Sequence, residues 1–444
     1  MLSPEVPGAG SLSADPNQAE AVQSPVDSEQ HEAFQHPVNA RPLGWQLLLS
    51  LANLVVWMAI IPTFQILLPA QIATFDAANK VTLLAVISLA GGITAILGNL
   101  LAGALSDRTT SRFGRRRPWI IGGAVLSAAS LVLLAFAPGI ATVAIGIIIL
   151  QFCINLDIAS LAALVPDQVP VSQRATVSAF AGLALPLGTL IGLILIAQII
   201  RGIQPSYLVL AAVLLIVLAI FVLITPDAVL PKGVMPPFSL GAFLAGFFSP
   251  LRSRDFTLTW IGRILVIFGY YTTVGYLLYY LQDVVHYEQA FPGQTAAQGV
   301  SIFQVLSTGV LIVATIVSGI ISDRLQRRKP FVIAAALIIA LALVILALFP
   351  AWPTVLVAAA TLGLGFGIFL SGDLALQTQV LPEQRHRGKD LGIQNTANLI
   401  PQILVPIVVG IVLSIFHSYP GLFLMGAVSA CIGAGLILPI RSVR

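Results

Sequence analysis

Charged side chains are scarce in this sequence. Only 9% of its 444 residues are Asp, Glu, Lys or Arg, whereas 57% are hydrophobic. An ordinary soluble domain has about 25% charged and roughly 45–50% apolar residues. Six of the 18 acidic residues also lie within the first 42 positions, so the rest of the chain carries even fewer charges. This composition excludes a soluble enzyme, a nucleic-acid-binding protein and a coiled coil, and it indicates a membrane protein.

Cysteine is almost absent as well. Cys153 and Cys431 are the two cysteines, and both lie inside apolar runs. This excludes a disulfide framework and a metal site built on a CxxC pair, and it leaves the redox compartment open. The sequence also lacks the HExxH, GxSxG and phosphate-loop patterns of metalloproteases, hydrolases and nucleotide-binding proteins. We therefore expect no enzyme activity, no metal and no organic cofactor.

Long apolar runs dominate the sequence from Leu43 onward. Residues 1–42 are rich in Ser, Pro, Gln and Glu, with Arg41 as their only base, and we expect a disordered tail there. The later runs approach the roughly 20 residues that cross a bilayer and are separated by short polar breaks. The predicted spans are 44–68, 81–105, 118–137, 140–165, 175–200, 206–225, 257–282, 297–321, 330–349, 354–381, 390–415 and 421–440.

The distribution of Lys and Arg predicts the orientation in the membrane. If both termini are cytoplasmic, 19 of the 22 bases lie in cytoplasmic segments. Lys80 and Arg201 would be outside, and Arg263 lies within a span. Cytoplasmic loops carry an excess of Lys and Arg. We therefore expect a multi-pass protein of the cell membrane, in contact with the lipid bilayer and with both termini in the cytoplasm.

The two halves of the chain repeat each other at an offset of 216 residues. Gly103, Ser106, Asp107 and Arg108 recur as Gly319, Ser322, Asp323 and Arg324, and Asp157, Pro166, Asp167 and Gln168 recur as Asp373, Pro382, Glu383 and Gln384. The basic residues before Pro118 recur before Pro330 at an offset of 212. The sequence therefore predicts a duplicated six-helix unit.

This duplication predicts an all-α protein of twelve transmembrane helices in two bundles related by a pseudo-two-fold axis along the membrane normal. We expect one bundle over residues 43–226, a linker with a short interfacial helix over 227–256, and the second bundle over 257–444. Such a pair of bundles suits alternating access to a site near the bilayer midplane. The expected function is secondary active transport of a small solute by a monomer.

The polar loop after the second span suggests a gate. Asp107 lies at the end of a helix, where it can accept backbone N–H groups or pair with loop arginines and thereby bridge the cytoplasmic ends of the bundles. The alternative is that these bases only set the orientation. The candidate gating residues of both repeats are Asp107, Arg108, Arg112, Arg116, Asp167, Asp323, Arg324, Arg328 and Glu383.

The glycine, aspartate and arginine of this loop, Gly103, Asp107 and Arg108, resemble the hallmark of the major facilitator superfamily. Residues 106–119 (SDRTTSRFGRRRPW) are similar to the loop of plant-type sucrose transporters and of the glycoside:cation symporters related to them. Residues 391–395 (LGIQN) and 400–402 (IPQ) are similar to their eleventh helix. The resemblance implies the major facilitator fold and uptake of a saccharide with protons.

One position departs from this family. The resemblance implies a proton-coupling aspartate in the fourth helix, where the matching position here is Gln151, which cannot titrate. The remaining carboxylates at membrane depth are Asp157 and Asp373, and a charge there costs about 2.5–3.5 kcal/mol on insertion scales. Either residue could couple to protons or join helices. Arg263 could neutralise Asp373, hold an anionic substrate or snorkel to the membrane surface.

Helical phase separates these polar residues. Gln151 and Asn155 are four residues apart and share a helix face, whereas Asp157 points about 200° away from Asn155 and is expected to contact a neighbouring helix. Asp373 and Gln377 share one stripe, so Asp373 ranks above Asp157 for ion coupling. Sugars bind through amides, carboxylates and aromatic faces. The candidate substrate-binding residues are therefore Asn53, Trp57, Gln65, Gln151, Asn155, Tyr270, Tyr271, Asp373, Gln377, Asn395 and Gln402.

Other aromatic residues and the small residues suggest structural roles. Trp45, Trp119, Tyr279 and Tyr280 are expected in the interfacial aromatic belts. The glycines of residues 363–367 indicate close helix packing or a bend, and Pro186 and Pro401 are expected to bend their helices. Two alternatives to sugar uptake stay open: a proton-coupled exporter of drugs or metabolites, and a membrane scaffold or sensor without transport.

Overall fold

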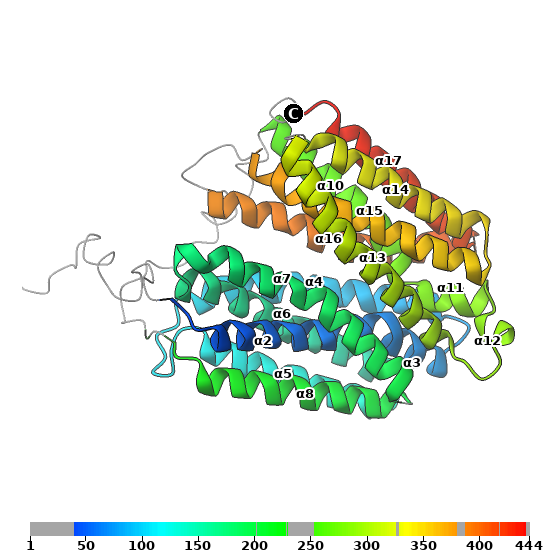
Figure 1. Cartoon of the computed structure of the whole chain (residues 1–444). Helices are drawn as coiled ribbons and strands as arrows, with labels where there is room; N and C mark the ends of the chain where they lie inside the picture. The colour runs from blue at the N-terminus through cyan, green and yellow to red at the C-terminus, as the bar shows by residue number, and fades with distance from the viewer. Residues whose placement is uncertain are drawn as a thin grey trace, which may run out of the picture.

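The computed structural model is helical throughout the part of the chain that it describes, with no strand there (Figure 1). The structure describes residues 40–200, 202–227, 229, 253–325, 328–379, 387–416 and 418–440. The expected tail and most of the expected linker, including its interfacial helix, lie outside these residues. The prediction of an all-α fold is confirmed.

The first half contains six helical segments. The first begins with α2 (Leu43–Pro62), passes through a π-helical turn at Thr63–Leu67 and ends with α3 (Leu68–Phe75). A second π-helical turn, Leu195–Ile199, extends the fifth segment. The remaining helices are α4 (Lys80–Ser106), α5 (Arg117–Ala135), α6 (Ile140–Gln168), α7 (Val171–Ile194) and α8 (Ile203–Ile224).

The second half repeats this order with one difference. Its first segment is broken into α10 (Arg254–Val274) and α11 (Leu277–Asp283), which meet at a bend of 44°, where the sequence had predicted one continuous span. Gly275 and Tyr276 form this break. The remaining helices are the short α12 (Tyr287–Ala290), then α13 (Ala296–Leu325), α14 (Lys329–Leu348), α15 (Trp352–Gln379), α16 (Arg387–Phe416) and α17 (Tyr419–Ile437).

Most of these segments can cross a bilayer. Ten helical stretches of the described chain are long and apolar enough, and the bent pair α10–α11 makes an eleventh. The helix α16 occupies the place of the remaining predicted span, and its apolar part is the shorter stretch Ile400–Leu413. The twelve sequence-predicted spans therefore each coincide with a helix or a helix pair.

The packing of the helices confirms the duplication. Within the first bundle the closest neighbours are α2 with α7, α4 with α6, α5 with α6, and α5 with α8. The equivalent pairs of the second bundle are α10 with α16, α13 with α15, α14 with α15, and α14 with α17. The bundles meet through α4 with α16 and α7 with α13, which are equivalent pairs as well. A pseudo-two-fold axis therefore relates the two bundles, as the repeat predicts.

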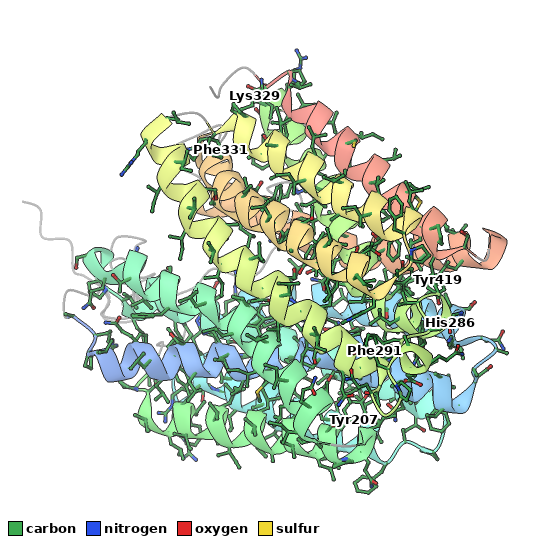
Figure 2. The ribbon with its side chains drawn as sticks, turned by 45° about the vertical axis from the view of Figure 1, so that its right-hand side comes forward. Tyr207, His286, Phe291, Lys329, Phe331 and Tyr419 are labelled. Carbon is green, nitrogen blue, oxygen red and sulfur yellow. The ribbon has the colours of Figure 1, made fainter. Side chains whose placement is uncertain are left out.

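The two ends of the molecule differ. In Figure 1 the bundles converge towards the end where α3 and α11 lie and diverge towards the other. Figure 2 shows His286, Phe291 and Tyr419 towards the converging end, and Lys329 and Phe331 at the opposite one. We call the first the closed end. The second is the basic end, because α5 and α14 begin there at Arg117 and Lys329.

Glycines allow the tightest helix contacts. A β-carbon on Gly98 of α4 would overlap the carbonyl oxygen of Phe152 on α6. In the second bundle a β-carbon on Gly363 of α15 would overlap the carbonyl oxygen of Ser307 on α13. Gly365, in the same run, faces α14, where its β-carbon would lie 2.9 Å from the backbone nitrogen of Ile339. The glycine run therefore serves close helix packing, one of the two roles that the sequence had suggested.

Gly363→Ala is expected to lower the free energy of unfolding by about 1 kcal/mol. The added methyl group costs about 1–3 kcal/mol through overpacking, and the higher helix propensity of Ala offsets about 1 kcal/mol of this. Gly309→Ala on α13 is the control, because no atom lies within 4 Å of a β-carbon there. Thermal unfolding in detergent should show a lower midpoint for the first variant only. Equal midpoints would contradict the packing role of Gly363.

Candidate functional site

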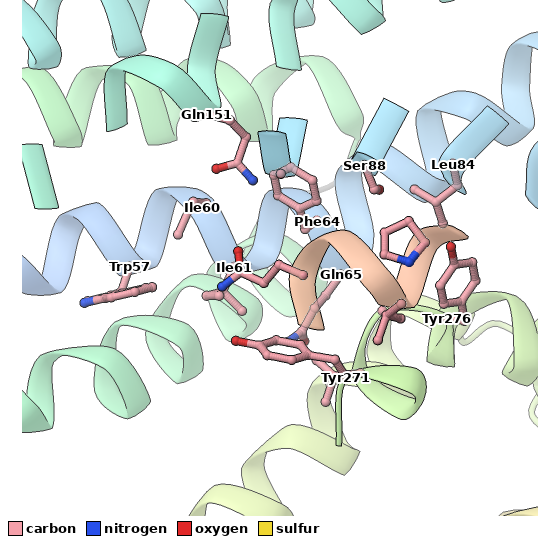
Figure 3. Close-up of a pocket in the computed structure, with 16 residues that line it drawn as sticks. Trp57, Ile60, Ile61, Phe64, Gln65, Leu84, Ser88, Gln151, Tyr271 and Tyr276 are labelled. Carbon is pink, nitrogen blue, oxygen red and sulfur yellow. The ribbon is translucent and has the colours of Figure 1, made fainter. Parts of the chain in front are cut away.

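A cavity of about 120 Å³ lies between the two bundles (Figure 3). Its walls come from the first helical segment, α4 and α6 of the first bundle, and from the α10–α11 break and α16 of the second. In Figure 3 the side chain of Gln151 lies on one side of the cavity and that of Tyr271 on the opposite side. Both bundles thus contribute polar groups to one chamber, as alternating access requires.

Five of the predicted substrate-binding residues line this cavity: Trp57, Gln65, Gln151, Tyr271 and Gln402. Tyr271 of α10 and Gln402 of α16 thus face the same cavity from the second bundle. Ser88 and Tyr276, which the sequence analysis did not select as site residues, line it too. No charged side chain belongs to the described lining, so its polar chemistry consists of amides and hydroxyls.

The other predicted substrate-binding residues lie elsewhere or outside the description. Asn53 donates a hydrogen bond of 2.9 Å to the carbonyl of Leu49 on its own helix. Asn155 likewise turns to the carbonyl of Gln151, at 2.8 Å, which agrees with their shared helix face. Tyr270 stacks on Phe366, with ring centroids 4.0 Å apart, and so packs into the second bundle. The side chains of Gln377 and Asn395 lie outside the described part of the structure.

Irregular backbone occurs at equivalent places on both sides of the cavity. The π-helical turn of the first bundle begins at Thr63, and Gly275 lies in the break of the second bundle, 212 residues later. This interval equals the offset between the basic loops of the two repeats. Both segments supply cavity residues, namely Phe64, Gln65, Gly275 and Tyr276. π-Helical turns inside α-helices are frequent at functional sites.

A buried ion pair lies in the second bundle. Arg263 of α10 pairs with Asp373 of α15 through Nη1 and Oδ2, 2.8 Å apart, and their side chains are 8% and 5% exposed. The other amino group of Arg263, Nη2, donates to Oδ1 of Asn398 on α16 at 2.9 Å. Asp373 makes a further interaction besides this pair. Of the three roles open for Arg263 in the sequence, the structure shows the pairing with Asp373, and this pairing joins three helices.

Asp157, the repeat partner of Asp373, has no such cation among the residues that the structure describes. It is fully buried, and neither carboxylate oxygen has a hydrogen-bond partner among the described residues. Its carboxyl group lies against Gly123 of α5 and leaves no room for a β-carbon there. Asp157 is therefore directed at a neighbouring helix, as its helical phase predicts, and it does not belong to the cavity lining.

The candidate gating residues of the first repeat join helices within the first bundle. Arg116 pairs with Asp107 at the end of α4 and, through Nε, with Asp167 of α6 at 2.9 Å. Arg115 also pairs with Asp167, at 2.5 Å. Asp227, after α8, accepts the backbone N–H of Arg116 at 2.5 Å, so four helices are tied together. Each of these pairs lies within the first bundle, so none of them is the expected bridge between the bundles.

The second repeat keeps part of this arrangement. Arg328 donates to Ser322 at 2.8 Å, as Arg116 donates to Ser106. Lys329 donates to the carbonyl of Leu438 just as Arg117 donates to that of Val222, its counterpart in the repeat. Of the other candidates, Arg108 is half-buried and interacts with other groups, Arg112 lies over the ring of Phe113, and Arg324 is exposed. Glu383 and the side chain of Asp323 lie outside the description.

Several of these residues could not be identified from the sequence. Asp227 follows a helix directly after Pro226, a place where an acid can cap a neighbouring helix, but the sequence does not say which one. Asn398 ends the largely polar stretch of residues 394–398, which gives no signal for its contact with Arg263. The belt prediction was wrong for Tyr279 and Tyr280, which are fully buried and donate to the carbonyls of Pro69 and Leu346.

Arg263→Met is expected to lower the free energy of unfolding by about 3 kcal/mol, because it leaves a buried carboxylate without its cation. The double variant Arg263→Met with Asp373→Leu should recover most of that loss, since replacing both partners removes the unpaired charge. Thermal unfolding of the two single variants and the double variant measures this. Additive losses in the double variant would show that the pair is not coupled.

Comparison with known proteins agrees with this architecture. The family model of the Major Facilitator Superfamily matches residues 46–314 and 295–443. The peptide transporter POT superposes with a TM-score of 0.72 at 13% identity, covering 92% of this chain and 98% of that one. A bacterial homologue of the human lysosomal transporter Spinster, in an inward-facing and occupied conformation, gives 0.69 at 14% identity, covering 88% and 95%.

One curated relative shares sequence locally. The general alpha-glucoside permease of Schizosaccharomyces pombe is 32% identical over 126 residues, which cover 25% of this chain. The chain therefore spans only 23% of the length of that permease. The family match, in contrast, extends over nearly the whole described chain. The chain belongs to the Major Facilitator Superfamily and is a multi-pass membrane transporter rather than an enzyme.

Proposed function

We propose that this protein is a secondary active transporter that takes up a neutral sugar or glycoside together with protons. The observation that carries the proposal is the cavity between the bundles, whose polar groups are amides and hydroxyls from both sides. The described lining holds no charged side chain that could compensate a charged solute, and burial of an unpaired charge is costly. Amides and aromatic faces suit the hydroxyls and C–H surfaces of a sugar.

Two sequence resemblances support a sugar as the transported solute. The loop at residues 106–119 and the α16 segment at 391–402 are similar to those of sucrose and glycoside transporters. The local match to an alpha-glucoside permease agrees with them. The lining also contains many apolar residues, such as Ile60, Leu84 and Val405, which favours the alternative of an exporter for lipophilic drugs or metabolites. A transport assay separates uptake, export and a scaffold without transport.

The orientation completes the proposal. With both termini in the cytoplasm of a cell, the basic end faces the cytoplasm and the closed end faces outward. The conformation described is then inward-facing. The ion-pair cluster around Arg116 would strengthen the inner end of the first bundle, and we propose that its arginines reach the second bundle when the transporter closes on the cytoplasmic side.

Asp373 is the proposed coupling group. Protonation of its carboxylate would weaken its pairing with Arg263 and so loosen the contact between α10, α15 and α16. Two of these helices carry the cavity residues Tyr271 and Gln402. A proton bound at Asp373 could thereby change the cavity wall, which is the coupling that symport needs. Asp157 is the second candidate, because it is buried without a partner among the described residues.

Gln65→Ala and Gln402→Ala are each expected to raise the KM for an α-glucoside about tenfold, because each removes a hydrogen bond worth about 1 kcal/mol or more inside the cavity. Uptake of a labelled disaccharide into reconstituted vesicles under an imposed proton gradient measures this. Ser50→Ala is the control, since its hydroxyl bonds to the carbonyl of Gln46 on the same helix. If no solute crosses in the parent protein, the transport proposal fails.

Asp373→Asn is expected to abolish uptake driven by the proton gradient while exchange of labelled for unlabelled sugar continues. The reason is that an amide can still hydrogen-bond but cannot bind a proton. Acidification that follows sugar addition should disappear in the same variant. Asp157→Asn is tested in the same assays. If proton-driven uptake is lost only in this variant, Asp157 and not Asp373 is the coupling group.

A further inference from the structure

The closed end is held by an ion pair between the bundles. Lys80 is the first residue of α4, and Asp283 is the last residue of α11. Their Nζ and Oδ1 atoms are 2.6 Å apart, although 203 residues separate them in the chain. The contact thus joins the two bodies that must move relative to each other for access to alternate.

Two tyrosines of the second bundle reinforce this pair. The ammonium group of Lys80 lies 4.8 Å from the ring centroid of Tyr279, a distance at which a cation is attracted to the ring face. The hydroxyl of Tyr279 donates to the carbonyl of Pro69 on α3 at 2.9 Å, which is a second bond between the bundles. The hydroxyl of Tyr419 donates to the other oxygen of Asp283, also at 2.9 Å.

The pair is directly connected to the cavity. Leu84, Ser88 and Gly92 line the cavity at four-residue intervals along α4, and Lys80 continues this stripe one turn further. On the other side Tyr276, in the α10–α11 break, lines the cavity, and α11 runs from there to Asp283. The ion pair therefore lies about one helical turn from the cavity lining on the α4 side.

The ion pair is only partly shielded from solvent. The side chains of Lys80 and Asp283 are 17% and 35% exposed, so water and salt screen the pair only in part. A second, uncharged contact lies at the same end, where Gln198 of the π-helical turn after α7 donates to Ser301 of α13 at 2.8 Å. The bundles therefore stay joined when the charged pair is lost, and its removal is expected to shift access rather than to unfold the protein.

We propose that Lys80 and Asp283, clamped by Tyr279 and Tyr419, form the gate of the closed end, and that the strength of this ion pair sets the ratio between the two access states. Opening towards the closed end requires the pair to separate, whereas opening towards the basic end preserves it. The inference rests on alternating access by the two bundles and not on the identity of the solute or of the coupling ion.

If this ion pair is the gate, removal of either charge should make the cavity more accessible from the closed end. A reporter cysteine at Ser88→Cys, in a background with Cys431→Ser, is labelled by a membrane-impermeant maleimide added on that side of reconstituted vesicles. Lys80→Gln and Asp283→Asn should each raise the labelling rate about three- to fivefold, the range expected for a partly exposed ion pair. The charge exchange Lys80→Asp with Asp283→Lys should return the rate towards that of the parent.

Asp76→Asn is the matched control at the same end. Asp76 accepts a hydrogen bond from Asn79 within its own loop at 2.9 Å, and this bond holds the pKa of Asp76 below its usual value, so the variant removes a carboxylate without cutting a contact between the bundles. Its labelling rate should equal that of the parent. Raising the salt concentration should increase labelling of the parent but not of Lys80→Gln.

Unchanged labelling in both neutral variants, or a parent rate that does not respond to salt, would overturn the gate. The salt series keeps the test valid even where a variant fails to fold, because it uses the parent gate. The assay contains no sugar and no proton gradient. A failed uptake experiment with normal gate behaviour would therefore reject the proposed substrate alone.

Discussion

The hydrocarbon core of a bilayer offers no water to a polar group, and this constraint decides where the deep polar side chains of this protein lie. Asn53 and Asn155 bond to carbonyls of their own helices. Arg263 and Asp373 neutralise each other. Gln65, Gln151 and Gln402 instead line the cavity between the bundles, although Gln151 also accepts a bond from Asn155 at 3.4 Å and Gln402 donates to the carbonyl of Asn398 at 3.5 Å. The deep polar groups are thus either bonded within the protein or placed at the cavity wall, where a solute can add partners.

Because the chain is duplicated, many of its polar contacts occur in both halves. The contacts that differ between the two copies show where each half specialises. The contacts of Arg116 with Ser106 and of Arg328 with Ser322 are equivalent, so the basic end is built twice on one plan. The buried aspartates are not equivalent. Asp373 has Arg263, whereas the positions that match Arg263 at the two repeat offsets are Leu47 and Leu51, both exposed on α2. Asp157 therefore has no cation in the matching place and packs against Gly123.

The sequence predicts the spans, the duplication and the family because these depend on composition, length and repeated landmarks. The rotation of each helix is much harder to predict. In a soluble protein the apolar stripe marks the buried face, but here the faces towards lipid and towards other helices are both apolar. Pattern alone therefore could not tell that Tyr270 packs on Phe366 while Tyr271, the next residue, lines the cavity. Tyr279 was placed in an interfacial belt for the same reason.

Contacts between distant helices lay beyond the sequence for a second reason. In the sequence, Lys80 and Asp283 are each an isolated charge next to an apolar run. Only the relative placement of the two bundles brings them together. Once they are together, the helices that carry them explain how a gate can act on a site. On α4 the stripe from Lys80 reaches the cavity at Leu84 and Ser88, and on the other side α11 joins α10 at the Gly275 break in the cavity wall. Because α4 carries both Lys80 and the cavity residues Leu84 and Ser88, a movement of α4 that separates the ion pair also moves part of the cavity wall.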